Sequence, residues 1–211
     1  MSTFKKIFTG DYLKRLDNII QWQEKDVLTQ ESVSKHSYKV AVFATAIMGE
    51  LFPAEDMDNR ITQGVQLLTI QRALFHDWDE AFILRDLSHE MKYNEYNGKQ
   101  IRKAVDSLAS HLLEKEFGGN NVVNTAMTTP DALARDVCKL ADWLAMAYFL
   151  NREIRLGNQT LKTETETVFK GLNVSAHTCR KIYLSYCQEF NLRSNVTLFD
   201  ELINLSDYVI G

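Results

Sequence analysis

Residues 130–158, PDALARDVCKLADWLAMAYFLNREIRLGN, decide the fold class of this chain. Pro130 and Asp131 are typical of a helix start, and Gly157 is typical of the residue that follows a helix end. Apolar residues recur between them at helical spacing rather than in the alternation of a strand. The stretch therefore predicts one long helix from Pro130 to about Arg155.

The same pattern extends through most of the chain. Apolar residues spaced by three and four predict further helices over 11–22, 34–51, 59–76, 97–117, 174–192 and 197–209, with Ser34 as the cap of the second. The Gly- and Asn-rich stretch 118–129 is predicted to be a loop. With no alternating strand pattern, repeat or linker, the sequence predicts one all-α domain over residues 1–211.

The composition excludes several classes of protein. Hydrophobic residues make up 45% and charged residues 25% of the 211, as in ordinary globular proteins rather than disordered ones. Lys+Arg 24 against Asp+Glu 28 gives a net charge of −4, which argues against binding of a nucleic acid polymer. Two or three local cations would still suffice for a small phosphorylated ligand.

The compartment is predicted from the cysteines and the N-terminus. Cys138, Cys179 and Cys187 form no CxxC pair and are expected to be reduced, buried thiols. The first 18 residues contain no apolar core of a secretory signal, and the apolar stretch Leu140–Leu150 is too short to cross a membrane. We expect a cytoplasmic protein without a membrane partner.

Three polar groups interrupt the apolar pattern, and the first is His36. Steps of four and three from His36 reach Val40, Phe43 and Ile47, so its imidazole is predicted to face the core. A core-facing histidine is either a hydrogen-bonded structural residue or a metal ligand.

The second group is His76-Asp77 in the segment ALFHDWDEAF, which ends a predicted helix. An imidazole nitrogen beside a carboxylate suits a divalent cation. Glu80 follows His76 by four residues, so a continuous helix would place all three side chains on neighbouring surface, within reach of one water.

The third group is Asp142, whose helical neighbours are nearly all apolar. A carboxylate in such surroundings needs a cation or hydrogen bonds. It is interpreted as a metal ligand, a helix cap, or the ion-pair partner of Arg135 or Lys139. With His36, His76 and Asp77 it would complete a set of two imidazoles and two carboxylates, suited to one octahedral metal with open positions.

These residues resemble a known family. His…His-Asp…Asp is the signature of HD-domain phosphohydrolases, and the segment ESVSKHS around His36 is similar to the E-x-V-S-x-H-S segment of YfbR-like 5′-deoxynucleotidases. HDWDE resembles the family's HDxxE, and Trp22 lies fourteen residues before His36, as the family's nucleotide-contacting Trp does. The resemblance covers about residues 10–160, and helices compatible with the fold follow over 161–211.

The resemblance implies a metal-dependent phosphohydrolase that removes the 5′-phosphate of deoxynucleoside monophosphates. It implies metal ligation by His36, His76, Asp77 and Asp142, with Co²⁺, Mn²⁺, Mg²⁺ or Zn²⁺ as the cation. Asp77 would orient the attacking water and Glu80 would act as general acid/base. The implied substrate-binding residues are Trp22, Gln21, Lys39, Arg85, Asp86, His89 and Lys92.

Departures from the family pattern leave alternatives open. Gln21 stands where the family has an arginine, Arg85 where it has a glycine, and Ser88 or His89 where it has a proline. A deoxynucleoside triphosphate triphosphohydrolase is therefore the second reading, and a helical nucleotide-binding module without turnover is the third. Trp22 is either a nucleotide contact or an ordinary packing residue.

Self-association is the last expectation from the sequence. Tyr183, Leu184, Tyr186 and Phe190 form an apolar cluster near the C-terminus. The cluster is interpreted as the surface of a homodimer or higher homo-oligomer, or as part of the core.

Overall fold

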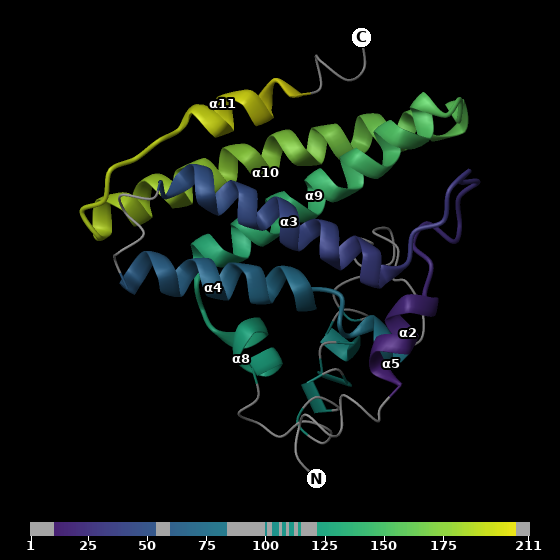
Figure 1. Cartoon of the computed structure of the whole chain (residues 1–211), viewed down its shortest axis with the longest axis horizontal. Helices are drawn as coiled ribbons and strands as arrows, with labels where there is room; N and C mark the ends of the chain where they lie inside the picture. The colour runs from purple at the N-terminus through teal and green to yellow at the C-terminus, as the bar shows by residue number, and fades with distance from the viewer. Residues whose placement is uncertain are drawn as a thin grey trace. The chain divides into compact units, whose positions relative to one another are not determined.

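The fold is all-α, as the sequence predicts. A computed structural model describes residues 11–53, 60–83 and 122–205, together with 100, 103–105, 107, 108, 110, 111 and 114. The helices are α2 (Tyr12–Asn18), α3 (Val33–Leu51), α4 (Arg60–Phe75), α5 (Glu80–Ile83), α8 (Val122–Thr128), α9 (Ala132–Arg155), the 3-10 turn η2 (Gln159–Leu161), α10 (Lys162–Glu189) and α11 (Thr197–Ile203) (Figure 1).

These elements belong to two compact units. Unit 1 is Met1–Ser37 with Phe75–Thr129, and unit 2 is Tyr38–Leu74 with Pro130–Gly211. The division falls inside α3 and α4, so the first turn of α3 and the last residue of α4 belong to unit 1. The expectation of a single domain over residues 1–211 stays a prediction.

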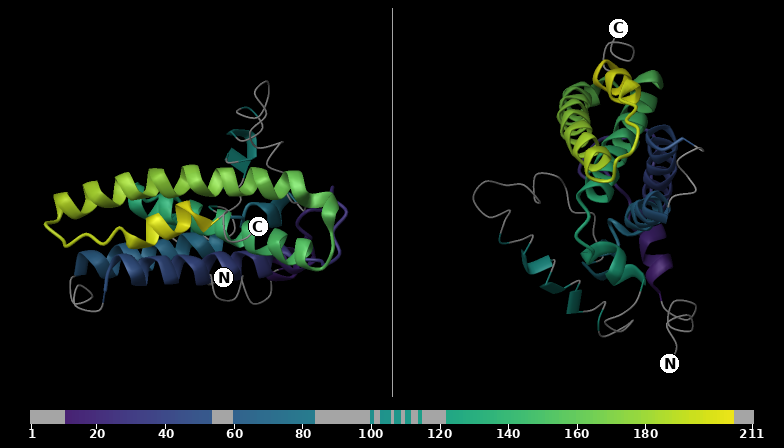
Figure 2. Two further views of the ribbon diagram at one scale, coloured as in Figure 1. Left: turned by 90° about the horizontal axis from the view of Figure 1, so that it is seen from above. Right: turned by 90° about the vertical axis from the view of Figure 1, so that its left-hand side faces the viewer.

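Unit 2 is built around the pair α9 and α10, which lie side by side in both views, with α11 packed along α10 (Figures 1 and 2). Each helix turns one apolar face inward. The fully buried side chains include Leu133, Leu140 and Leu150 of α9 and Leu172 and Tyr183 of α10. Burial of such side chains is the main source of stability for a helical unit.

Tyr183 joins three elements of unit 2. Its ring packs against Phe52, with centroids 5.7 Å apart, and against Phe199 of α11 at 5.8 Å. Its hydroxyl donates to the carbonyl of Leu51 at 2.8 Å and accepts from the amide of Asn195 at 3.0 Å. Tyr183 is thus a core residue rather than part of a self-association surface. Homo-oligomerisation stays a prediction.

Three residues after Tyr183 complete the apolar cluster of the sequence. Tyr186 packs between Phe52 at 6.1 Å and Phe190 at 4.6 Å, and burial raises the pKa of its phenol to about 12. Leu184 is 40% exposed. Packing within the unit therefore explains Tyr183 and Tyr186, the alternative that the sequence left open.

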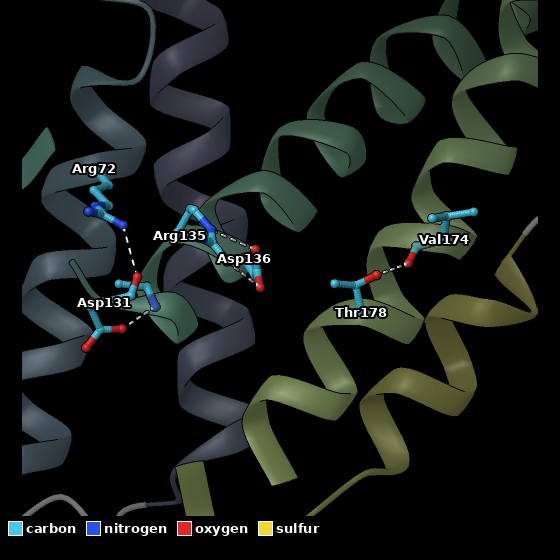
Figure 3. Close-up of polar contacts among 7 residues, drawn as sticks. Arg72, Asp131, Arg135, Asp136, Val174 and Thr178 are labelled. Atoms are coloured by element: carbon cyan, nitrogen blue, oxygen red, sulfur yellow. Dashed lines mark hydrogen bonds and ion pairs between the residues drawn. The ribbon is translucent and has the colours of Figure 1, made fainter. Parts of the chain in front are cut away.

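The start of α9 is fixed by a side-chain cap. Asp131 is the N-cap, and its carboxylate accepts from the amide of Ala134 at 2.8 Å. Arg72 of α4, itself buried, donates to the carbonyl of Asp131 at 3.1 Å (Figure 3). Burial lowers the pKa of Arg72. The predicted helix from Pro130 to Arg155 is confirmed to within two residues.

Unit 1 has a smaller core. Leu16 and Ile19 pack with Val33, Trp78 and Ala81, and α2 contacts α5. Arg15 of α2 donates to the carbonyl of Ala81 at 3.4 Å. Backbone bonds join residues 19–21 to 31–33, from Gln21 N to Glu31 O (2.8 Å) and from Val33 N to Ile19 O (2.9 Å). These contacts hold the start of α3 against the segment that follows α2.

Three expectations about local structure are wrong. The predicted loop 118–129 contains α8, and α10 begins at Lys162 rather than at 174. The helix expected over 11–22 is described over Tyr12–Asn18, and residues 21–24 form a turn. Most of the helix predicted over 97–117 lies outside the described residues.

Two predictions of the sequence concern the membrane and the thiols. Within the described part of the chain, no helix has the length and apolarity needed to cross a bilayer. Cys138, Cys179 and Cys187 are free and buried, as expected. Burial raises the pKa of Cys179 from its ordinary value of 9.0 to about 12.

Candidate metal centre

His36 lies in the first turn of α3, which begins one residue earlier than the sequence predicts. The carbonyl of Ser32 accepts from the amide of His36 at 3.0 Å, and the Ser32 hydroxyl accepts from the amide of Lys35 at 3.4 Å. Ser32, not Ser34, thus precedes the helix and bonds its first amides. His36 is only 2% exposed, which confirms that its imidazole faces the core.

His76 and Asp77 lie in a turn between α4 and α5. The helix α4 ends at Phe75, and α5 begins at Glu80. The amide of Trp78 bonds to the carbonyl of Phe75 at 3.0 Å, and the amide of Glu80 to that of Asp77 at 3.1 Å. The expectation that His76, Asp77 and Glu80 share one continuous helix is therefore wrong, because the chain leaves α4 just before His76.

The turn brings His76 beside His36. Their ring centroids are 5.3 Å apart at an interplanar angle of 52°, and each ring offers a nitrogen within 4.8 Å of the other's. Nε2 of His76 lies 2.9 Å from Oδ2 of Asp77, whose side chain is 9% exposed. The two imidazoles, nearly closed to solvent, offer nitrogen donors of the kind that a divalent cation takes, and the Asp77 carboxylate lies next to one of them.

Glu31 adds a second carboxylate next to His36. Its Oε1 lies 3.6 Å from Nδ1 of His36, and its side chain is 5% exposed. Metal-binding histidines usually direct their second ring nitrogen to a carboxylate or carbonyl, which fixes the tautomer and the ring orientation. Glu31 lies within the segment ESVSKHS, and no role for it was predicted from the sequence. The signal that could have indicated one is its position shortly before the predicted ligand His36.

Glu80 is the first residue of α5 and is fully buried. Its neighbour Ala81 belongs to the core of unit 1, so packing of α5 against α2 sets the position of Glu80. A buried carboxylate three residues from Asp77 has the chemistry of a proton donor or acceptor for the same site.

Asp142 lies on α9, in unit 2, among buried neighbours such as Ala141 and Ala145. Nζ of Lys139 lies 2.9 Å from its Oδ2. Of the alternatives that the sequence left open, the ion pair with Lys139 is present. Arg135 instead pairs with Asp136 at 3.1 Å, a contact that raises the pKa of its guanidinium (Figure 3).

The candidate substrate residues fall into two groups. Gln21 is buried, and Trp22 follows it in the turn with a positive φ of 62° and a half-buried side chain. In unit 2, the ammonium of Lys39 lies 5.2 Å from the ring centroid of Tyr148. Arg85, Asp86, His89 and Lys92 lie outside the described residues.

The fold is similar to that of a known enzyme class. A crystal structure of an HD-domain phosphohydrolase from Listeria innocua matches with a TM-score of 0.57 and 18% sequence identity, over 89% of this chain and 85% of that one. At this identity the match shows the HD-domain fold alone. No curated protein sequence matches the chain.

The family of the chain follows from a match to a protein-family model. The model described as 5′-deoxynucleotidase YfbR-like matches residues 8–189. The chain therefore belongs to the YfbR-like family, and its fold is that of an HD-domain phosphohydrolase. His36 and His76, with Asp77 next to His76, are the part of that signature that lies in unit 1.

Proposed function

We propose that this protein is a 5′-deoxynucleotidase, which hydrolyses deoxynucleoside monophosphates to a deoxynucleoside and inorganic phosphate. The observation that carries the proposal is the proximity of the His36 and His76 rings, with Asp77 next to His76, in a chain that belongs to the YfbR-like family. Asp142 is proposed as the fourth ligand, from the family pattern and its place among apolar neighbours on α9.

The chain's own residues would divide the reaction among them. When bound, a divalent cation (Co²⁺, Mn²⁺, Mg²⁺ or Zn²⁺) supplies a Lewis acid that stabilises phosphoryl charge and lowers the pKa of water. Asp77 would orient the attacking water, whose oxygen forms a bond to phosphorus as the bond to the 5′-oxygen breaks. Glu80 would deliver the proton that the departing 5′-oxygen needs.

Substrate recognition is proposed for the segment after α2 and for four basic residues elsewhere in the chain. Trp22 would stack on the base or ribose, beside Gln21. Lys39, Arg85, His89 and Lys92 would neutralise phosphate charge, with Asp86 nearby, as the family pattern implies. The protein is further proposed to act in the cytoplasm as a homodimer or higher homo-oligomer.

A triphosphohydrolase is the second candidate, and Gln21 is the observation that favours it. The monophosphatases carry an arginine there, whereas Arg85, His89 and Lys92 add cations elsewhere in the motif region. A pocket that accepts a longer phosphate chain would release tripolyphosphate from a deoxynucleoside triphosphate. Both reactions attack the phosphorus nearest the sugar, so the metal ligands do not separate them.

Product analysis separates the two candidates. The protein is incubated with dAMP and with dATP, each with and without Mn²⁺ or Co²⁺, and the products are resolved by ion-exchange chromatography. We expect metal-dependent inorganic phosphate and deoxyadenosine from dAMP. Tripolyphosphate from dATP with dAMP untouched would establish the second candidate, and the absence of any turnover would favour a binding module.

A further inference from the structure

One face of α9 carries three residues whose side chains meet. Lys139, Asp142 and Trp143 are spaced by three and four, so they lie on neighbouring turns. The ammonium of Lys139 is 2.9 Å from Oδ2 of Asp142 and 5.0 Å from the ring centroid of Trp143. The lysine is thus held at both a carboxylate and an aromatic face.

The ring of Trp143 lies against α10 at Gly171. A Cβ added at Gly171 would come within 2.6 Å of Cη2 and Cζ2 of Trp143, closer than atoms can pack. Glycine inside a helix is less favourable than alanine, so its presence in the middle of α10 needs a reason. Here the reason is space for the indole ring.

Stability alone explains the pair of Lys139 and Asp142 poorly. Its two side chains are 39% and 15% exposed, and ion pairs with solvent access contribute little. The lysine also precedes the aspartate along the helix, which is the less favourable order with respect to the helix dipole. A charge-assisted hydrogen bond does, however, fix the rotation of a carboxylate.

We propose that Lys139 is a positioning residue, which orients the Asp142 carboxylate for metal binding and is itself held by Trp143 and Gly171. The inference rests on the proposed role of Asp142 as a metal ligand. Hydrogen bonds from outside a metal site commonly orient its ligands, and their loss weakens metal binding. An ammonium near a metal cation also repels it. If Lys139 only competes for the carboxylate, its replacement should therefore strengthen metal binding instead of weakening it.

The test is titration of the apoprotein with Co²⁺ alone, followed by calorimetry and by the visible absorption of the bound ion. Lys139→Met is expected to weaken Co²⁺ binding about 10- to 100-fold and to change the absorption spectrum, because a carboxylate without this hydrogen bond can bind the ion in a different orientation. Lys139→Arg, which keeps the charge and the donors, should restore most of the affinity. Gly171→Ala, which displaces the ring of Trp143 from α10, should weaken binding in the same direction.

Arg135→Met is the matched control. It removes a cation from an exposed ion pair on the same helix, so Co²⁺ binding should stay as in the wild type. If Lys139→Met binds Co²⁺ equally well or more tightly, the positioning role is wrong.

Asp142→Asn distinguishes failure of the positioning role of Lys139 from failure of Asp142 as a proposed metal ligand. Loss of Co²⁺ in Asp142→Asn with unchanged binding in Lys139→Met would refute only the positioning role. Unchanged binding in Asp142→Asn would remove Asp142 from the ligand set, and the inference with it.

Discussion

Glu31 and His36 form a buried pair in which a carboxylate oxygen lies 3.6 Å from Nδ1 of the imidazole. The pair ties the first turn of α3 to the segment after α2, because the carbonyl of Glu31 accepts from the amide of Gln21. Gln21, a proposed substrate contact, is therefore bonded to Glu31, whose side chain faces the proposed metal ligand His36.

Glu31→Gln tests this pair. The change keeps the size of the side chain but removes its charge, so His36 should lose part of its orientation. We expect metal affinity to fall about 10-fold, at the lower end of such losses, measured by calorimetric titration with Mn²⁺. Glu24→Gln, at an exposed position of the preceding turn, serves as the control. Equal affinities in the two variants would exclude an orienting role for Glu31.

Asp77→Asn tests the metal centre itself. The amide removes a negative charge beside His76, and a bound ion stabilises only the folded state. We expect the wild type to gain thermal stability on addition of Mn²⁺ and the variant to gain little, with turnover lost. Asp79→Asn, in the same turn, should behave as the wild type. Full metal occupancy in Asp77→Asn by elemental analysis would contradict the assignment.

Glu80→Gln separates metal binding from proton transfer. Glutamine keeps the packing of this fully buried side chain but cannot transfer a proton. We expect metal content near that of the wild type and a kcat lower by about 10²–10⁴-fold. A variant that turns over at the wild-type rate would leave Glu80 with a structural role only.

Tyr183→Phe tests the core of unit 2. The change removes the hydroxyl that bonds to Leu51 O and Asn195 N, and Leu51 is fully buried. We expect the free energy of unfolding to fall by about 1–3 kcal/mol, measured by urea denaturation, with metal affinity unchanged. The control is Tyr38→Phe, at a residue that is 66% exposed, which should change the free energy of unfolding by less than about 0.5 kcal/mol.

The buried thiols predict a response to alkaline pH. The pKa of Cys179 rises from 9.0 to about 12 on folding, because burial disfavours the thiolate. Its contribution to stability is therefore complete below pH 9 and is lost as the pH approaches 12. At pH 9 we expect iodoacetamide to modify the cysteines in guanidinium chloride but not in the native protein, as read by mass spectrometry. Rapid native labelling of Cys179 would disprove its burial.

The sequence predicted the helical class and the family more accurately than the local structure. The bounds of α9 and the burial of His36 followed from apolar spacing and end signals. The start of α10 did not, because residues 162–173 contain three threonines, Val168, Gly171 and Asn173, which are weak helix formers. Val168, Phe169 and Leu172 are nevertheless buried there, and this packing outweighs propensity.

Other errors arise from interactions that no local pattern encodes. The helix α8 forms in a stretch of asparagine, valine and threonine, whose intrinsic preference is for turns or strands. The turn at 76–79 interrupts a pattern that reads as one helix, and Trp78 packs into the core with Phe75 through it. The proposed roles of Glu31 and Lys139 depend on distances between side chains, and the spacing of residues along the sequence does not give these distances.

The end of α9 has a consequence for the order of folding. Gly157, at a φ of 99°, reverses the chain, and the amide of Asn158 bonds back to the carbonyl of Glu153 at 3.0 Å. The 24 residues of α9 and the 28 of α10 are therefore neighbours along the chain as well as in space. Contacts across so short a connection cost little loop-closure entropy. We expect this helical hairpin to form first, and residues 38–74 to dock onto it later.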